Sequence, residues 1–250
     1  MYKFYTRDYI GETVADVTHW RQGNKKTAGT WIEKSIINDD HNGIAHVVGN
    51  GISRLKLNLE FLHGQSGGEG GPHSVGQSYG CNMLFKDFNP TFLICVNQDI
   101  INKIAETDYC ENNIVYTTRK NIIKHPGKFH LYPNWQILNA GPAALRLACA
   151  DGHKKIYMIG MDFYFPGIKQ NVYPQDGNLY KPIENHNYAN VNLLKQLCEI
   201  FQLYDDVEFY HVQDGHDPVH LFDEFNWFRN VKSIGFRQYI SVAQLGAIAR

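Results

Sequence analysis

Residues 139–164 hold a helix-forming run followed at once by a strand-forming run, and this pair constrains the fold more than any other stretch. Asn139 is a favourable N-cap residue, and Pro142 is tolerated in a first helical turn, where its missing N–H loses no partner. Small apolar residues then recur at spacings of three and four, which predicts a buried helix that ends at Gly152. Residues 156–159 are continuously apolar, which is typical of a strand covered on both faces.

Polar residues follow this predicted strand. In open α/β sheets, ligands bind beyond the carboxyl ends of the strands. Gly160, Asp162 and Tyr164 therefore lie at a candidate binding site, and the helix start at Asn139 is placed to receive an anion.

Predicted strands alternate with predicted helices from residue 44 to residue 212, which indicates an α/β fold with a mostly parallel sheet flanked by helices. We expect residues 44–250 to form a single domain and residues 1–43 to be a helical or mixed appendage packed on it. The other predicted strands cover residues 44–48, 91–97, 114–117, 207–212 and, as an edge strand, 129–132; the other predicted helices cover residues 55–62, 100–106, 191–201 and 240–249.

Residues 63–78 are dominated by Gly, Ser and Gln and are expected to form a mobile surface loop. A lid that orders on ligand binding and a tolerated insertion are equally open interpretations of this loop.

The net charge of −1 gives the chain no overall nucleic-acid signature, but two stretches are locally basic. Neither residues 119–130 nor residues 226–250 contain an acidic residue. They are candidates for tracking the phosphates of a polyanion, and ordinary solvated surface is the alternative. Their basic residues are Arg119, Lys120, Lys124 and Lys128 in the first stretch and Arg229, Lys232, Arg237 and Arg250 in the second.

The five cysteines include no Cys-x-x-Cys pair and lie mostly in apolar runs, so we expect reduced, buried thiols and a cytoplasmic location. The first residues do not resemble a signal peptide, and no apolar run approaches the ~20 residues that a membrane-spanning helix needs. We therefore expect no membrane partner, while the oligomeric state stays open.

A glycine turn, Gly49-Asn-Gly, follows the first predicted strand of the main domain. Such turns bring backbone N–H groups to a phosphate or a ribose, but the spacing is not a full G-x-G-x-x-G, so a plain strand-to-helix turn is also open. Asn82 and Asn97 each follow a short apolar segment. Their amides offer a donor and an acceptor to bases and ribose hydroxyls, and structural turn caps are the alternative.

A group of potential metal ligands lies at and beyond the end of the last predicted strand. These side chains are of the types that bind zinc or manganese. Pro218 interrupts the helical spacing that a zinc-binding pair would use, so a polar turn is the main alternative and no bound metal is expected. The group consists of His211, Asp214, His216, Asp217 and His220.

The turn at residues 49–53, Gly-Asn-Gly-Ile-Ser, resembles the G-N-G-P-S nucleotide-binding turn of the family 42 sialyltransferases and the related DUF115 proteins. Four further motifs match in the same order, the last being Gly-Met-Asp-Phe-Tyr at residues 160–164, which is similar to the family's G-I-D-F-Y. The resemblance covers residues 44–212 and implies a Rossmann-like fold of GT-A type. It implies that the nucleotide contacts Asn50, Gly51, Ser53, Asn82, Asn97, Asn139, Ala140, Gly141, Gly160 and Asp162.

The same resemblance implies catalytic roles. Tyr164 and Tyr173 correspond to tyrosines that hold the leaving phosphate, and His186 corresponds to the family's general base. Asn139 and Ala140 stand where the family has hydroxyl residues that hold the sialic acid carboxylate, so sialic acid is not the expected sugar.

The function we expect is therefore metal-independent transfer of a sugar from a CMP- or UDP-sugar to a hydroxyl acceptor. No Asp-x-Asp motif follows an apolar strand, and tyrosine hydroxyls with a helix N-terminus can stabilise the departing phosphate instead. The chain also resembles uncharacterised proteins of tailed phages, which implies a hydroxymethylated DNA base as one acceptor, held through residues 119–130 and 226–250. A Mg²⁺- and ATP-dependent pyrophosphokinase of the pterin type and a non-catalytic nucleotide- or DNA-binding protein stay open as alternatives.

Overall fold

The computed structural model describes residues 2–7, 19–22, 25–34, 43–63, 75–132, 138–162, 171–173, 186–213 and 227–248. The strands are β1 (Tyr2–Arg7), β2 (His19–Gln22), β3 (Lys25–Lys34), β4 (Ile44–Val48), β5 (Gln77–Cys81), β6 (Phe92–Ile94), β7 (Ile114–Thr117), β8 (His130–Leu131), β9 (Lys155–Ile159), β10 (Glu208–Val212) and β11 (Val231–Ile234). The α-helices are α1 (Gln98–Ala105), α2 (Tyr109–Asn112), α3 (Arg119–Lys124), α4 (Ala140–Ala150), α5 (His186–Leu203) and α7 (Phe236–Ile248). Three 3-10 helices, η1 (Ile52–Lys56), η2 (Leu59–His63) and η3 (Asn82–Lys86), follow β4 and β5.

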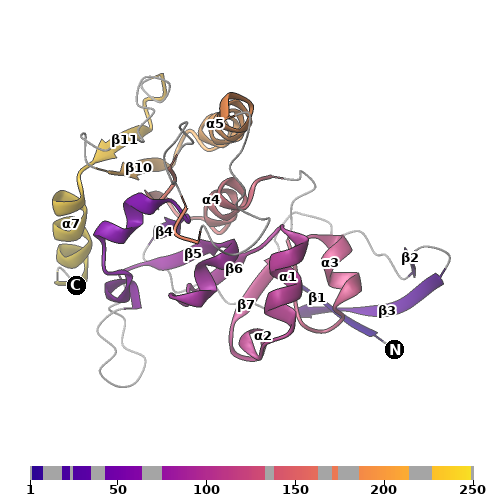
Figure 1. The fold of residues 1–250 in the computed structure, drawn as a ribbon. Helices are drawn as coiled ribbons and strands as arrows, with labels where there is room; N and C mark the ends of the chain where they lie inside the picture. The colour runs from indigo at the N-terminus through magenta and orange to yellow at the C-terminus, as the bar shows by residue number, and fades with distance from the viewer. Residues whose placement is uncertain are drawn as a thin grey trace.

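One continuous sheet contains all of these strands, in the order β11-β10-β9-β4-β5-β6-β7-β8-β1-β3-β2. Neighbouring strands are parallel throughout, except for the antiparallel pair of β2 and β3. Figure 1 shows α7 beside β10 and β11 at one end of the molecule and β1 to β3 at the other. The α/β fold with a mostly parallel, helix-flanked sheet is confirmed.

The central strands β9, β4, β5, β6 and β7 are buried on both faces, because their successive residues enter two different apolar cores. In β9, Ile156 and Met158 pack with α4 and α5, whereas Tyr157 and Ile159 pack with the 3-10 helices, α1, α3 and α7. This period of two is the pattern that a strand buried on both sides requires. The helices therefore form two outer layers and leave only the ends of the strands for a site.

The N-terminal strands extend this sheet, with β1 joining β8 through the pairing of Tyr5 with His130. The expectation of helix or mixed structure before residue 43 is wrong for the described residues there, which are all in strands. Because β1 pairs beyond it, β8 is an inner strand and not the predicted edge strand.

Two local predictions on the first half of the main domain also need correction. The helix predicted at residues 55–62 is instead the pair η1 and η2, because Leu57 adopts extended dihedral angles and interrupts it. The loop predicted at residues 63–78 overlaps β5, which starts at Gln77. Its remaining residues from 64 to 74 lie outside the described part of the chain.

The later helices are longer than predicted, since α5 begins at His186 and α7 begins at Phe236. In the described ranges, no helix has the combination of length and apolar character that crossing a bilayer demands.

Candidate functional site

The order in which the chain adds strands to the sheet reverses between β4 and β9. From β4 the chain builds β5, β6, β7 and β8 outward on one side, and it then returns to build β9, β10 and β11 on the other side. In open α/β sheets, ligands bind outside the carboxyl ends of the strands at such a switch point. The turns after β4 and β9 lie there, and they carry the predicted site residues Asn50, Gly51, Gly160 and Asp162.

These two turns touch each other. The N–H of Gly51 donates to the carbonyl oxygen of Gly160 at 2.9 Å. The carboxylate of Asp162 accepts from the Ser53 backbone N–H at 2.9 Å and from the Ser53 hydroxyl at 2.5 Å. The structure thus brings together four of the predicted binding residues, which hydrogen-bond to one another across the two turns: Gly51, Ser53, Gly160 and Asp162.

The close approach of these two turns explains why glycine occupies positions 49, 51 and 160. A Cβ at Gly49 would lie 2.3 Å from the carbonyl oxygen of Gly160, and a Cβ at Gly51 would lie 2.3 Å from Cγ of Asp162. Gly160 itself has a φ of 61°, a left-handed conformation that favours glycine. The backbone N–H of Gly51 is occupied by this contact between turns and is not presented to a phosphate.

Asn50 and Asn82 each leave an acceptor free at the carboxyl ends of β4 and β5. Asn50 is 7% exposed, and its Nδ2 donates to the carbonyl oxygen of Cys81 at 3.0 Å. The buried Oδ1 atoms of both asparagines have no hydrogen-bond partner among the described residues. Leaving a buried acceptor unpaired costs about 1–3 kcal/mol, so each oxygen is suited to receive a donor from a ligand.

The backbone at Asn82 is also unusual. Its φ of 51° is the one positive value among the described residues other than glycine. Asparagine tolerates this left-handed conformation better than most residues, and such outliers are concentrated at functional sites. The geometry therefore marks the start of η3, beside Asn50, as the centre of the candidate site.

Asn97 and Asn139 have other environments. Oδ1 of Asn97 accepts from the backbone N–H groups of Asp99 at 2.9 Å and Ile100 at 3.4 Å, which makes Asn97 the N-cap of α1. Asn139 occupies the N-cap position of α4 as predicted, but its exposed side chain makes no capping hydrogen bond. Its backbone N–H donates instead to Oε1 of Gln196 at 2.8 Å.

The start of α4 packs against the turn after β9. Ala140 is buried, and a Cβ at Gly141 would lie 3.1 Å from the sulfur of Met161, the residue before Asp162. The small residues at positions 140 and 141 thus bring the first turn of α4 close to the switch point.

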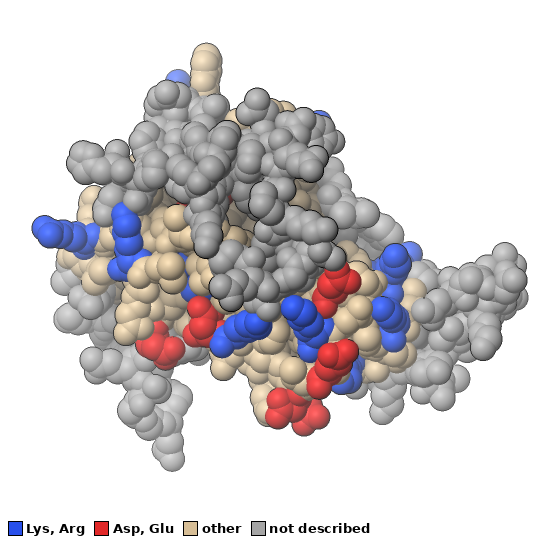
Figure 2. Space-filling model, in the orientation of Figure 1, with Lys and Arg blue, Asp and Glu red and all other residues tan. Residues whose placement is uncertain are grey.

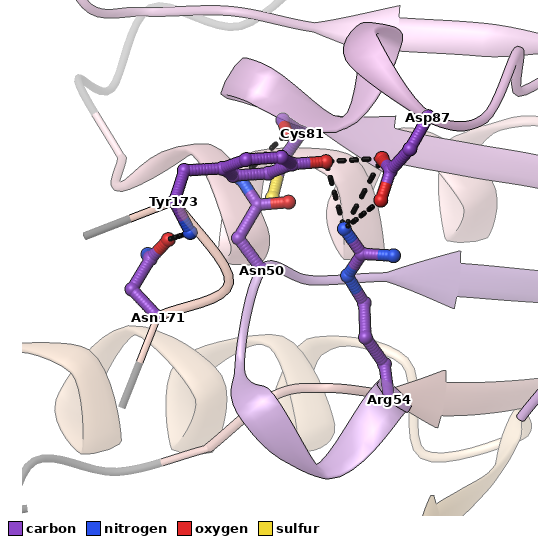
Figure 3. A network of polar contacts seen from close by, with 6 residues as sticks. All are labelled: Asn50, Arg54, Cys81, Asp87, Asn171 and Tyr173. Carbon is purple, nitrogen blue, oxygen red and sulfur yellow. Dashed lines mark hydrogen bonds and ion pairs between the residues drawn. The ribbon is translucent and has the colours of Figure 1, made fainter. Parts of the chain in front are cut away.

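Tyr173 belongs to a polar network that the sequence did not predict (Figure 3). Nη2 of Arg54 donates to both carboxylate oxygens of Asp87, at 3.0 and 3.2 Å, and to the hydroxyl of Tyr173 at 2.7 Å. The Tyr173 hydroxyl in turn donates to Oδ1 of Asp87. Burial, followed by this hydrogen bond to the carboxylate, raises the pKa of Tyr173 well above its usual value, so the phenol stays protonated.

The two other predicted catalytic residues are less completely described. Tyr164 lies outside the described residues. His186 is the first residue of α5, and only its backbone is described. The role of Tyr164 as a hydrogen-bond donor to the leaving phosphate and that of His186 as the general base stay predictions.

The cysteines are free thiols, as expected, and Cys81, Cys95 and Cys149 are buried. Burial raises the pKa of Cys81 to about 12, so this thiol beside Asn50 is neutral at physiological pH. It contributes a backbone acceptor to Asn50 and an apolar side chain to the core.

The candidate metal ligands lie mostly outside the described residues, and two lysines of the first basic stretch make local contacts. His211 is buried in β10, and the other candidates, from 214 to 220, are not described; the described residues contain no group of three potential metal ligands. In the first basic stretch, Lys124 donates to Oδ1 of Asn102, and Lys128 donates to the carbonyl oxygen of Ala105. Figure 2 shows acidic side chains mixed among the basic ones on this face, around α1, α2 and α3.

No protein-family model matches the chain, and no curated protein does so either. Among solved structures, the chain is similar to a variant of the sialyltransferase CST-II in complex with CMP, with a TM-score of 0.44 and 15% sequence identity. The match covers 67% of this chain and 80% of that chain.

Proposed function

We propose that this protein is a glycosyltransferase that takes its sugar from a nucleotide donor, a CMP-sugar in preference to a UDP-sugar. The observation that supports this most directly is the pair of buried Oδ1 atoms of Asn50 and Asn82, which have no hydrogen-bond partner among the described residues and lie just after the neighbouring strands β4 and β5. Two acceptors call for donors on the ligand. Ribose hydroxyls, which both nucleotides carry, and the amino group of cytosine are such donors, whereas uracil has a carbonyl oxygen in place of that amino group.

The chemistry assigned to the site needs no metal ion. When the bond between the sugar and the phosphate breaks, negative charge builds up on the phosphate oxygens. The Tyr164 hydroxyl is proposed to donate a hydrogen bond to one of them, with the N-terminal turn of α4 nearby as a further source of positive potential. The small residues Ala140 and Gly141 support this assignment because they let that turn approach the carboxyl end of β9.

The acceptor must lose a proton as it attacks the sugar. His186 is proposed as the general base, since an imidazole titrates near neutral pH and such catalysis contributes about 10²–10⁴-fold in rate. A hydroxyl group is the proposed acceptor. A hydroxymethylated base in DNA is one such acceptor, and residues 119–130 and 226–250 would then contact its phosphates.

Ligand-dependent thermal stability tests the donor. The protein would be heated with CMP, UDP, GDP, ATP and NAD, each with and without Mg²⁺. A ligand at 100 times its Kd adds about 2.7 kcal/mol of stability, so a real site gives a clear shift. We expect a shift with CMP that does not require Mg²⁺. A shift with only ATP and Mg²⁺ would contradict the proposal and favour a pyrophosphokinase.

Paired asparagine variants connect that shift to the site. Asn82→Ala should abolish the CMP shift, because it removes one of the two free acceptors. Asn58→Ala is the matched control, since Asn58 only accepts from the N–H of Glu60 at the surface. Loss of the shift in both variants would point to instability and not to a ligand contact. Nucleotide binding without hydrolysis or transfer of the sugar would indicate a non-catalytic binding protein.

Duplex binding tests the DNA acceptor. If the basic stretches contact phosphates, binding to duplex DNA should weaken steeply as salt is raised from 50 to 200 mM. Absence of such binding would favour a glycan or another small hydroxyl acceptor.

A further inference from the structure

The Arg54 network, formed by Arg54, Asp87 and Tyr173, joins three segments that are distant in the sequence. Arg54 lies in η1 after β4, Asp87 follows η3 after β5, and Tyr173 belongs to the described segment 171–173. Arg54 is 3% exposed and Tyr173 is 9% exposed, whereas Asp87 closes the network from the surface, with its side chain 43% exposed. Figure 3 shows the three polar groups converging on one another.

The same segments carry the free acceptors of the candidate site. Asn50 lies four residues before Arg54, and Asn82 lies five residues before Asp87. The third segment is bonded directly to the first, because the N–H of Val172 donates to the carbonyl oxygen of Asn50 at 2.9 Å and Asn171 forms a bridge with Gly51. Any movement of the turn after β4 relative to the turn after β5 would therefore have to break the Arg54 network.

We infer that Arg54 and Asp87 are positioning residues that, together with Tyr173, set the spacing between the Oδ1 atoms of Asn50 and Asn82. This inference rests on the proposed function, since it assigns the spacing to recognition of the nucleoside. The planar guanidinium fixes the direction of each hydrogen bond that it donates, which a lysine in its place would not do.

The network also gives Tyr173 a different role from direct contact with the leaving phosphate. The single proton of its hydroxyl is donated to Asp87, and its oxygen accepts from Arg54. A phosphate oxygen needs a donated proton, so this hydroxyl cannot bind the phosphate while the network is intact. Tyr173 acts on the nucleotide through Asn50.

The test compares Tyr173→Phe and Asp87→Ala with Tyr79→Phe as a matched control. The Tyr79 hydroxyl is also buried and donates to an aspartate, Asp151, at 2.5 Å, but it lies near the C-terminal end of α4 and away from the candidate site. Two quantities would be measured: hydrogen exchange at the Val172 amide without ligand, and the Kd values of cytidine and of CMP.

We expect both network variants to speed exchange at Val172 and to weaken cytidine and CMP equally, by about tenfold or more, because the misplaced amides contact the nucleoside. The double variant should bind as weakly as either single variant. Tyr79→Phe should lower the melting temperature and leave both Kd values unchanged.

Three outcomes would overturn the inference. If Tyr173→Phe weakened CMP alone and Asp87→Ala left CMP unaffected, Tyr173 would be a phosphate ligand. Unchanged exchange at Val172 in both variants would show that the network does not hold the turns. If the unaltered protein bound neither cytidine nor CMP while exchange still rose in the variants, the proposed function would fail, and the network would be a purely structural device.

Discussion

The hydroxyl of Tyr239 in α7 donates a hydrogen bond of 2.8 Å to Nδ1 of His46 in β4, and so ties the C-terminal helix to the centre of the sheet. Nε2 of the same imidazole lies 3.1 Å from the carbonyl oxygen of Val75, which can only accept. Nε2 therefore carries the proton and Nδ1 is the acceptor. His46 is fully buried and neutral, with its ring stacked on Tyr157.

This arrangement predicts a loss of stability in mild acid. Burial lowers the pKa of His46 from 6.5 to about 4, an effect that the Val75 hydrogen bond only partly offsets. Between these two values the unfolded chain binds the proton and the folded chain does not, so stability falls as the pH falls through this window. The full difference is about 3 kcal/mol, to be measured by urea unfolding at pH 7 and pH 4.

His46→Gln should flatten this pH dependence, and His125→Gln is the control. The pKa of His125 is also lowered, first by partial burial and then by Lys124 and Lys128, but this imidazole is only partly buried. An equal flattening in both variants would mean that His46 is not the group responsible.

Gly51→Ala should destabilise the fold by about 3 kcal/mol and abolish nucleotide binding. Its new Cβ would overlap Asp162, which holds the turn after β4 through Ser53. Gly43→Ala is the matched control, because Gly43 has a φ of 74° and open space around its Cβ position, and it should cost only about 1 kcal/mol. Similar free energies of unfolding for the two variants would contradict the close approach of the turns.

Substitutions at Asn97 can distinguish its role as the N-cap of α1 from a direct contact with the nucleotide. Asn97→Ala should cost about 1 kcal/mol of unfolding free energy, because the first N–H groups of α1 lose their acceptor. Asn97→Asp should keep that stability, since aspartate caps equally well. If Asn97→Asp also keeps the Kd of CMP, the cap accounts for the whole role of this residue, and the cytidine contact implied by the resemblance is wrong.

Replacing His186 by Ala should reduce sugar transfer by about 10²–10⁴-fold while leaving the Kd of the nucleotide nearly unchanged. Single-turnover kinetics with the identified donor, alongside equilibrium binding, would measure both quantities. Activity equal to that of the unaltered protein would sink the assignment of His186 as the base.

The parts of the fold that local patterns encode could be predicted from the sequence. The predicted strand at residues 156–159 lies within β9, and the predicted helix from Asn139 corresponds to α4, because continuous apolar runs and small-residue spacing reflect burial directly. The turns after β4 and β9 were recognised by their glycines. Their mutual contact was not, because hydrogen bonds between residues so far apart in the chain leave no local period.

The contact between Arg54 and Asp87 could not be predicted for the same reason. The Arg54 network joins positions separated by 33, 86 and 119 residues, and each of its members taken alone reads as an ordinary polar residue in a turn. The strand β5 was not predicted, for a related reason. Gln77, Ser78 and Gly80 have weak strand propensity, and they form a strand because they pair with β4 on one side and β6 on the other.

The strand β8 is only two residues long, yet it is the element through which β1, β2 and β3 join the rest of the sheet. Only a few backbone pairings therefore hold these strands, and four strands, β5 to β8, separate them from β4. Substitutions in the N-terminal strands should therefore have little effect on the geometry around Asn50.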